Sequence, residues 1–210
     1  MVSDIANVVL VHGAWADGSC WNRVITGLRT RGIASVAAPL PLTTLADDVA
    51  ALDRTLERVD APVVLVGHAY AGAVIAETKS EKVKSLVYVT ALAPDQGEKV
   101  TDVFYRTAPH PKAPKLSPDS HGLIYLPNDA FAAAFAQNAT TEEQEQLAAV
   151  QRPIALLCIT VPVGRPLWKD RPSHFLLAEQ DRMIVKETQF FMAKRMKAKV
   201  RTHRLTTRRA

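Results

Sequence analysis

The chain has 210 residues, of which 48% are hydrophobic and 22% are charged. This length suffices for one sizeable core and is too short for two ordinary domains, so we expect a single domain over residues 1–210. The longest apolar runs have the length of strands and fall well short of the roughly 18 residues of a membrane span, so they do not predict a membrane protein.

The formal net charge of +5 arises at one end of the chain. Residues 194–210 hold eight basic side chains and no acidic one, and without these eight charges the net charge would be −3. Basic residues confined to one tail, with no aromatic residues between them, do not predict a nucleic-acid partner. The first four residues lack the basic region of a signal peptide, so we expect a cytoplasmic protein. The sequence predicts no oligomeric state.

Neither a metal nor another cofactor is expected. Two cysteines, Cys20 and Cys158, are too few for a disulfide framework, and neither has companions at metal-ligand spacing. The segment from Gly67 to Gly72 matches neither the dinucleotide-binding pattern nor the P-loop pattern.

Short β-rich runs alternate with amphipathic helical runs along the chain. Strands are expected at residues 7–11, 35–38, 62–66, 85–89 and 174–178, and helices at residues 19–30, 44–59, 70–79 and 185–197. This alternation predicts an α/β fold, in which a mostly parallel sheet carries helices on both faces. In the second of these helices the apolar residues would face the sheet, while the acidic residues, Asp48 among them, would face water.

The alternation breaks over residues 94–168, where prolines punctuate the chain and helical patterns occur only at residues 129–137 and 141–150. A long excursion inside a compact domain is usually functional, and a lid or cap over an active site is the natural interpretation. The alternative is a subdomain that serves packing alone.

A buried strand enters a turn of small residues at Gly67 and leaves it as a helix. This is the pattern of a nucleophile elbow, which needs small residues two positions before and after the nucleophile because the turn is tight. Gly67 and Ala71 occupy those two positions, and Ala69 occupies the centre. A methyl group cannot form an acyl-enzyme, so the predicted elbow lacks its attacking atom.

The strand over residues 7–11 ends in the turn His12-Gly13, which alone could be purely structural. Next to a nucleophile elbow, a first loop of this kind supplies one amide of an oxyanion hole, and the residue after the nucleophile supplies the other. We assign these amides to Ala14 and Tyr70. Substrate contacts are predicted for the neighbouring loop residues and for possible aromatic wall residues, namely His12, Gly13, Trp15, His68 and Trp168.

A late strand delivers an acid at its carboxyl end, where catalytic groups gather in open α/β sheets. Asp181 is therefore predicted to orient a catalytic histidine. Glu179 is its competitor for that role, and a plain loop-capping aspartate is the structural alternative.

Together these motifs resemble the α/β-hydrolase superfamily, in particular small bacterial members similar to the branch of plant methylesterases and hydroxynitrile lyases. The likeness runs from about residue 8 to residue 204 and includes Ala91-Leu92-Ala93-Pro94 after the next strand. It implies an α/β-hydrolase fold and a cofactor-free serine hydrolase. The lyases of that branch carry a hydroxyl residue where Gly13 stands, so the resemblance implies esterase activity rather than lyase activity.

Two explanations compete for Ala69: a substitution introduced into an active enzyme, and a natural pseudoenzyme. The otherwise complete elbow and oxyanion loop favour the introduced substitution.

The C-terminus also departs from the family pattern. The resemblance implies a catalytic histidine near position 207, followed by a closing helix, but position 207 is a threonine. A one-base shift of reading frame turns codons for Val-Asp-His-Ala-Pro into Leu-Thr-Thr-Arg-Arg, the sequence of residues 205–209. We therefore hypothesise a frameshift that removed the histidine and the helix. His203 is a possible substitute base, although its spacing is that of a strand residue.

The sequence thus predicts a serine hydrolase for carboxylic esters of small apolar or aromatic substrates, inactive as written. The alternative is a non-catalytic protein of the same fold that binds a small ligand. A hydroxynitrile lyase is disfavoured by Gly13.

Overall fold

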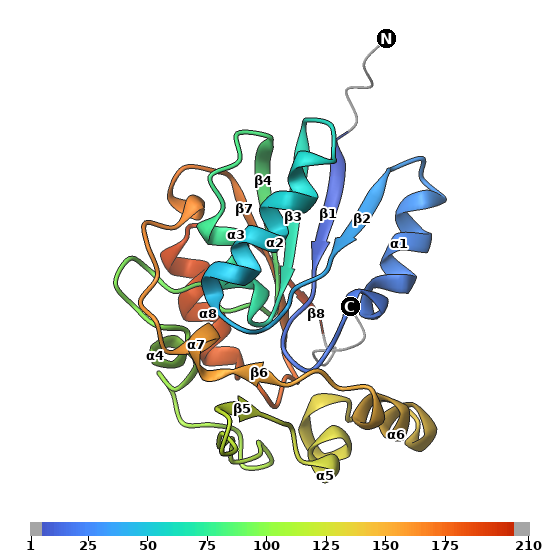
Figure 1. Ribbon diagram of the computed structural model, residues 1–210, viewed down its shortest axis with the longest axis vertical. Helices are drawn as coiled ribbons and strands as arrows, with labels where there is room; N and C mark the ends of the chain where they lie inside the picture. The colour runs from blue at the N-terminus through green and yellow to red at the C-terminus, as the bar shows by residue number, and fades with distance from the viewer. Residues whose placement is uncertain (1–5, 204–210) are drawn as a thin grey trace.

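The computed structural model describes residues 6–203. Six strands form one sheet in the order β2-β1-β3-β4-β7-β8, and every neighbouring pair is parallel. The strands are β1 (Asn7–Val11), β2 (Ser35–Ala38), β3 (Val63–His68), β4 (Val83–Val89), β7 (Ser173–Ala178) and β8 (Lys199–His203). The predicted parallel sheet is confirmed (Figure 1).

Alternate residues of the strands pack into two different cores because successive side chains point to opposite faces. On one face, Val8 and Leu10 pack with residues of α1 (Asn22–Arg29). On the other, Val9 and Val11 belong to the larger core, which includes residues of α2 (Leu45–Glu57), α3 (Ala71–Glu77) and α8 (Lys186–Arg195). The helices therefore cover both faces, as the alternation predicted.

Helix α2 is capped at its start, because the Thr44 hydroxyl accepts a hydrogen bond from the Asp47 amide at 3.0 Å. Its apolar residues Leu45, Leu52 and Leu56 are buried against the sheet. The prediction that all its acids face water is wrong for Asp48, whose exposed fraction is 0%. Local periodicity missed it because its partners come from distant parts of the chain.

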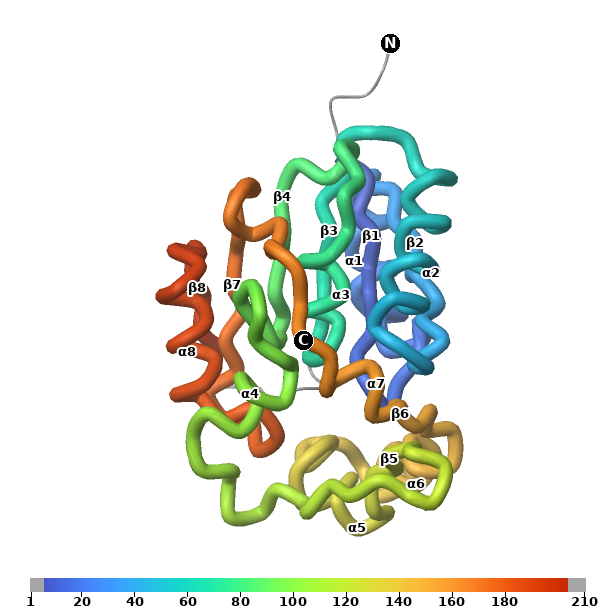
Figure 2. Tube along the Cα trace, turned by 60° about the vertical axis from the view of Figure 1, so that its left-hand side comes forward, coloured from blue at the N-terminus to red at the C-terminus, as the bar shows by residue number. Residues whose placement is uncertain are grey.

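Most of the segment between β4 and β7 forms a cap beyond the carboxyl ends of the strands (Figures 1 and 2). The elements of the cap are α4 (Val100–Phe104), β5 (Leu123–Ile124), α5 (Asn128–Ala130), the π-helix η2 (Phe131–Phe135), α6 (Thr141–Ala149), β6 (Ile154–Ala155) and α7 (Leu156–Ile159). The 3-10 helix η3 (Leu167–Lys169) follows the cap and packs on α3 before the chain enters β7. A further 3-10 helix, η1 (Gly18–Trp21), precedes α1.

The cap has a small core of its own around Phe131 and Phe135, which Met183 of the sheet domain joins. The helix predicted over residues 129–137 is replaced by the short α5 and the π-helix, whereas the one predicted over residues 141–150 is found as α6.

Within residues 6–203, no helix has the length and apolar character needed to cross a bilayer. The predicted loss of a closing helix concerns residues after 203, outside the described residues.

Candidate active site

Strand β3 ends in a tight turn at Ala69, and α3 begins directly after it. Ala69 has a φ of 49°, in the left-handed region that residues with a side chain rarely adopt. Its carbonyl accepts hydrogen bonds from the Leu92 amide at 2.9 Å and the Gly72 amide at 3.1 Å. A Cβ on Gly67 would lie 2.9 Å from the Ala71 oxygen, so the turn requires glycine there. Strain of this kind clusters at functional sites.

The first loop lies against this turn. A Cβ built on Gly13 would lie 3.0 Å from both the Ala69 Cβ and the His68 carbonyl oxygen, so the two segments approach closely here. Within residues 6–203, neither the Ala14 amide nor the Tyr70 amide donates a backbone hydrogen bond. The two amides assigned to an oxyanion hole thus belong to adjacent segments, and neither N–H is used by a backbone acceptor among the described residues.

His12 is fully buried and holds the first loop in place. Its Nε2 accepts a hydrogen bond from the Leu40 amide at 3.2 Å, so the ring proton lies on Nδ1, which donates to the Gly13 carbonyl at 2.9 Å. Burial lowers the pKa of His12 and keeps the ring neutral. Both ring nitrogens are occupied by the backbone, which is a structural role.

A cavity of about 250 Å³ opens beside the turn, between the sheet and the cap. Its lining is almost entirely apolar and combines Ala14, Trp15, Ala69 and Tyr70 with cap residues such as Phe104, Phe135, Ile154 and Leu156. His12, Gly13, His68 and Trp168 do not line it, so we do not retain them as proposed substrate contacts. The cap residues belong to no sequence motif, so no pattern in the sequence identifies them individually.

Trp15 joins the first loop to the cap. Its amide donates to the Arg152 carbonyl at 3.0 Å, and its indole Nε1 donates to the Ile124 carbonyl at 2.9 Å. The ring meets Phe135 edge-on, with 6.1 Å between the centroids. Trp168, by contrast, is buried away from the cavity, where Lys169 and Arg195 lie over its ring.

Asp181 follows β7 and is only 4% exposed. Its Oδ1 accepts hydrogen bonds from the amides of Met183 at 2.8 Å and Ile184 at 2.9 Å, and both of those residues line the cavity. These bonds are those of a loop cap, and the role of orienting a histidine stays a prediction. The competitor Glu179 is more exposed and pairs with Lys186 at 3.5 Å.

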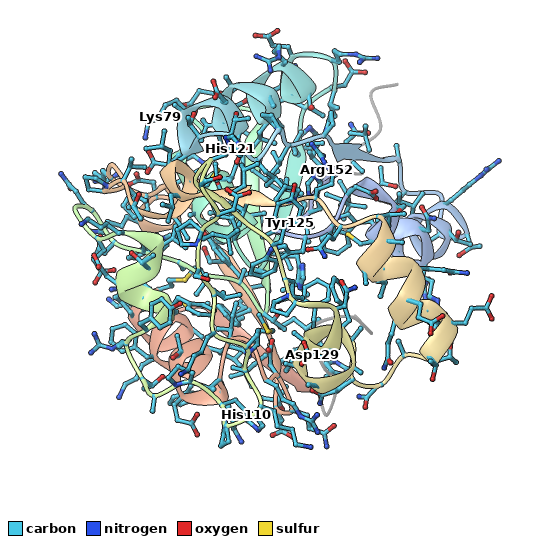
Figure 3. The ribbon with its side chains drawn as sticks, turned by 60° about the horizontal axis from the view of Figure 1, so that its bottom comes forward. Lys79, His110, His121, Tyr125, Asp129 and Arg152 are labelled. Carbon is cyan, nitrogen blue, oxygen red and sulfur yellow. The ribbon has the colours of Figure 1, made fainter. Side chains whose placement is uncertain are left out.

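No described histidine stands beside Ala69 in the cavity lining. His203, at the end of β8, has an exposed side chain, and its carbonyl accepts the Glu179 amide at 2.9 Å, as expected of a strand residue. Seen from the cap side, His110 and His121 lie at opposite ends of the cap (Figure 3). Thr207 and the hypothesised frameshift over residues 205–209 lie outside the described residues.

Asp48 is a residue near the elbow that the sequence analysis missed. It accepts a hydrogen bond from the Tyr70 hydroxyl at its Oδ2, at 2.7 Å, and this bond links the residue after Ala69 to helix α2.

Among the described residues, no three His, Cys, Asp or Glu side chains cluster as metal ligands.

A parallel sheet, a strand-turn-helix elbow at its carboxyl edge and a cap over an apolar cavity together define a hydrolase-type α/β scaffold. Residues 8–207 match the alpha/beta hydrolase family, and the chain belongs to that family.

Among proteins of known activity, the chain is similar to a carbendazim hydrolyzing esterase from Nocardioides sp., with 33% identity over 123 residues, or 50% of each chain. It aligns with about half the length of the curated relatives that it matches.

Several solved structures share the fold, and two of them illustrate it. Polyneuridine aldehyde esterase has a TM-score of 0.82 at 19% identity, with 97% of this chain and 92% of that one covered. A variant of tomato methylketone synthase I, complexed with beta-ketoheptanoate, has a TM-score of 0.78 at 19% identity, with 95% and 89% covered.

Proposed function

We propose that this fold is the scaffold of a serine hydrolase for carboxylic esters with small apolar or aromatic groups, and that Ala69 stands where the nucleophilic serine would. The observation that carries the proposal is the left-handed turn at Ala69, whose methyl group lines the apolar cavity beside Ala14 and Tyr70. The esterase that resembles the chain over half its length supports the same reaction class.

In the active form, a serine hydroxyl at position 69 would attack the ester carbonyl after losing its proton to a histidine. The amides of Ala14 and Tyr70 would bind the oxyanion, and Asp181 would orient the imidazole. The tetrahedral intermediate would then collapse and expel the alcohol, which takes the proton back from the histidine, and water would release the acid from the acyl-enzyme and regenerate the serine. As written, the chain lacks the attacking oxygen, so we expect it to bind esters without cleaving them.

The cavity limits the substrate. Ligand cavities usually enclose about 300–1,000 Å³, and this one, at about 250 Å³, is small. Its apolar walls favour short acyl chains or a single aromatic ring, because polar groups buried there would lack partners.

Hydrolysis of short-chain p-nitrophenyl esters tests the proposal. We would compare the chain as written with Ala69→Ser, and with Ala69→Ser carrying the tail read in the neighbouring frame. The last protein is expected to exceed the unmodified chain by ~10³-fold or more. Ala132→Ser adds a hydroxyl to an exposed alanine of the cap and is the matched control. A restored protein no faster than this control would refute the hydrolase proposal.

The alternative is a non-catalytic protein that binds a small ligand, and the methyl group of Ala69 inside an intact cavity favours it. Beta-ketoheptanoate, which the tomato structure contains, is a suitable probe with an apolar tail. Calorimetric binding by the unmodified chain, together with silence of the restored protein towards esters, would support this function over the first.

A further inference from the structure

Asp48 is a buried carboxylate on which three separate segments converge. Its Oδ1 accepts a hydrogen bond from the Leu42 amide, in the loop after β2, at 2.7 Å. Its Oδ2 accepts the Tyr70 hydroxyl at 2.7 Å and the Cys158 thiol, in the cap helix α7, at 3.6 Å. One side chain of α2 therefore contacts the loop, the elbow and the cap together.

This carboxylate is costly for the fold. Burial raises the pKa of Asp48, although the hydrogen bonds from Tyr70 and Leu42 oppose that rise. Within the described part of the chain, no lysine or arginine forms an ion pair with it. A buried charge without a cation lowers stability, and an apolar side chain of similar volume would avoid the cost. Its contacts therefore point to a role other than stability.

Tyr70 is the contact that matters for the site. It directly follows Ala69, occupies the position before the first residue of α3, lines the cavity and is only 3% exposed. Its amide is the second donor of the proposed oxyanion hole. Because Asp48 holds the far end of this side chain, it restrains the ring and, through the ring, the backbone that carries the amide.

The same carboxylate reaches the cap by two routes. The Leu42 amide donates to Asp48, and the Leu42 carbonyl accepts a hydrogen bond from the Ala155 amide of the cap at 3.0 Å. Cys158 contacts Asp48 directly, and burial raises the pKa of that thiol to about 12, so it remains a protonated donor. Leu156, between these two cap residues, lines the cavity.

We propose that Asp48 is a positioning residue for the oxyanion side of the site: its carboxylate holds Tyr70 at the elbow and the α7 end of the cap in the arrangement that binds substrate. The inference rests on the proposed function, and a measurement on the unmodified chain separates the two.

The first measurement needs no activity. The chain has four tyrosines, so labelling with ¹⁵N-tyrosine produces four backbone amide signals, and Tyr70→Phe identifies the Tyr70 signal by its loss. We expect Asp48→Asn to shift the Tyr70 signal and leave the other three in place. Asp47→Asn is the matched control, since Asp47 is the exposed neighbour on the same helix. A Tyr70 shift no larger than that caused by Asp47→Asn would overturn the proposal.

The second measurement uses the protein restored with Ala69→Ser and the in-frame tail. Removing an oxyanion donor costs ~10²–10³ in kcat, so misplacing one through Asp48→Asn should lower kcat by ~10–100-fold with KM changed far less. Tyr70→Phe keeps the ring and the amide but loses the hydroxyl, and should act in the same way. It decides the question should Asp48→Asn fail to fold.

An unchanged kcat in a folded variant would refute the positioning role. Should the restored protein itself be inactive, the hydrolase proposal fails, and the amide signals still decide whether Asp48 positions Tyr70.

Discussion

Burial assigns the histidines of this chain to different roles. His12 sits in the first loop beside the elbow, where its residue type suggests chemistry, yet both of its ring nitrogens bond to backbone groups. His174 lies on β7 and is exposed. The same side chain is thus a fixed part of the scaffold at one position and a surface group at the other.

The buried position of His12 predicts a pH dependence of stability. Its pKa in the folded protein is below the ordinary value of 6.5, so the unfolded chain binds the proton first. The free energy of unfolding should therefore fall as the pH drops below about 6.5. In urea unfolding between pH 8 and pH 5, His12→Gln should be less stable at pH 8 but lack this part of the decline.

His174→Gln is the control and should decline like the unmodified chain. Parallel curves for the unmodified chain and His12→Gln would show that His12 does not carry the effect.

At the scale of elements, the site depends on how closely α3 packs on the turn after β4. A Cβ on Gly72 would lie 2.3 Å from the Leu92 carbonyl oxygen and 2.9 Å from the Ala91 Cβ. Leu92 is held there by the hydrogen bond that its amide donates to the Ala69 carbonyl, so the helix start, the elbow and the turn are packed and bonded together.

Two glycine-to-alanine changes in helices should therefore have opposite effects. Gly72→Ala places a methyl against backbone and should cost about 1–3 kcal/mol or more of unfolding free energy. Gly27→Ala, in α1, meets only the end of the Arg31 side chain at 3.7 Å and should stabilise by about 0.5–1 kcal/mol. Chemical denaturation measures both, and a stabilised Gly72→Ala would contradict the close packing described here.

At the scale of the whole molecule, the cavity is formed jointly by the sheet with its loops and by the cap. The sheet domain contributes the elbow and the first loop, while the cap contributes Phe104, Phe135 and Leu156. Trp15 donates hydrogen bonds to the carbonyls of Ile124, in β5, and Arg152, just before β6, and so joins the first loop to the cap. The size of the cavity is therefore set by where the cap lies over the strand ends (Figure 2).

Filling the cavity from the cap should change this size limit. In the restored protein, Leu156→Trp should lower kcat/KM for p-nitrophenyl hexanoate by ~10-fold relative to p-nitrophenyl acetate, because about 1–3 kcal/mol of pocket contact is lost. Leu157→Trp is the matched control, since Leu157 is the next residue and is 55% exposed. Equal acetate-to-hexanoate ratios in the two variants would show that Leu156 does not limit the substrate.

Local patterns determined much of this protein. The alternation of strands and helices predicts the parallel sheet, and the small residues around Ala69 predict the elbow, because a tight strand-to-helix turn needs them over a span of five residues. The prolines of residues 94–168 indicate a break in the alternation, and the cap lies there. No sequence pattern predicts the π-helix at residues 131–135.

Only the tertiary structure decided which polar groups are buried and which residues meet. Asp48 follows the period of an exposed helix face, yet it is buried because Leu42, Tyr70 and Cys158 converge on it from 6, 22 and 110 residues away. The cavity lining likewise joins Trp15 to Phe135. Contacts across such separations leave no periodic trace in a single sequence, so residue type and spacing determined the scaffold and the turn, while long-range packing decided the site around them.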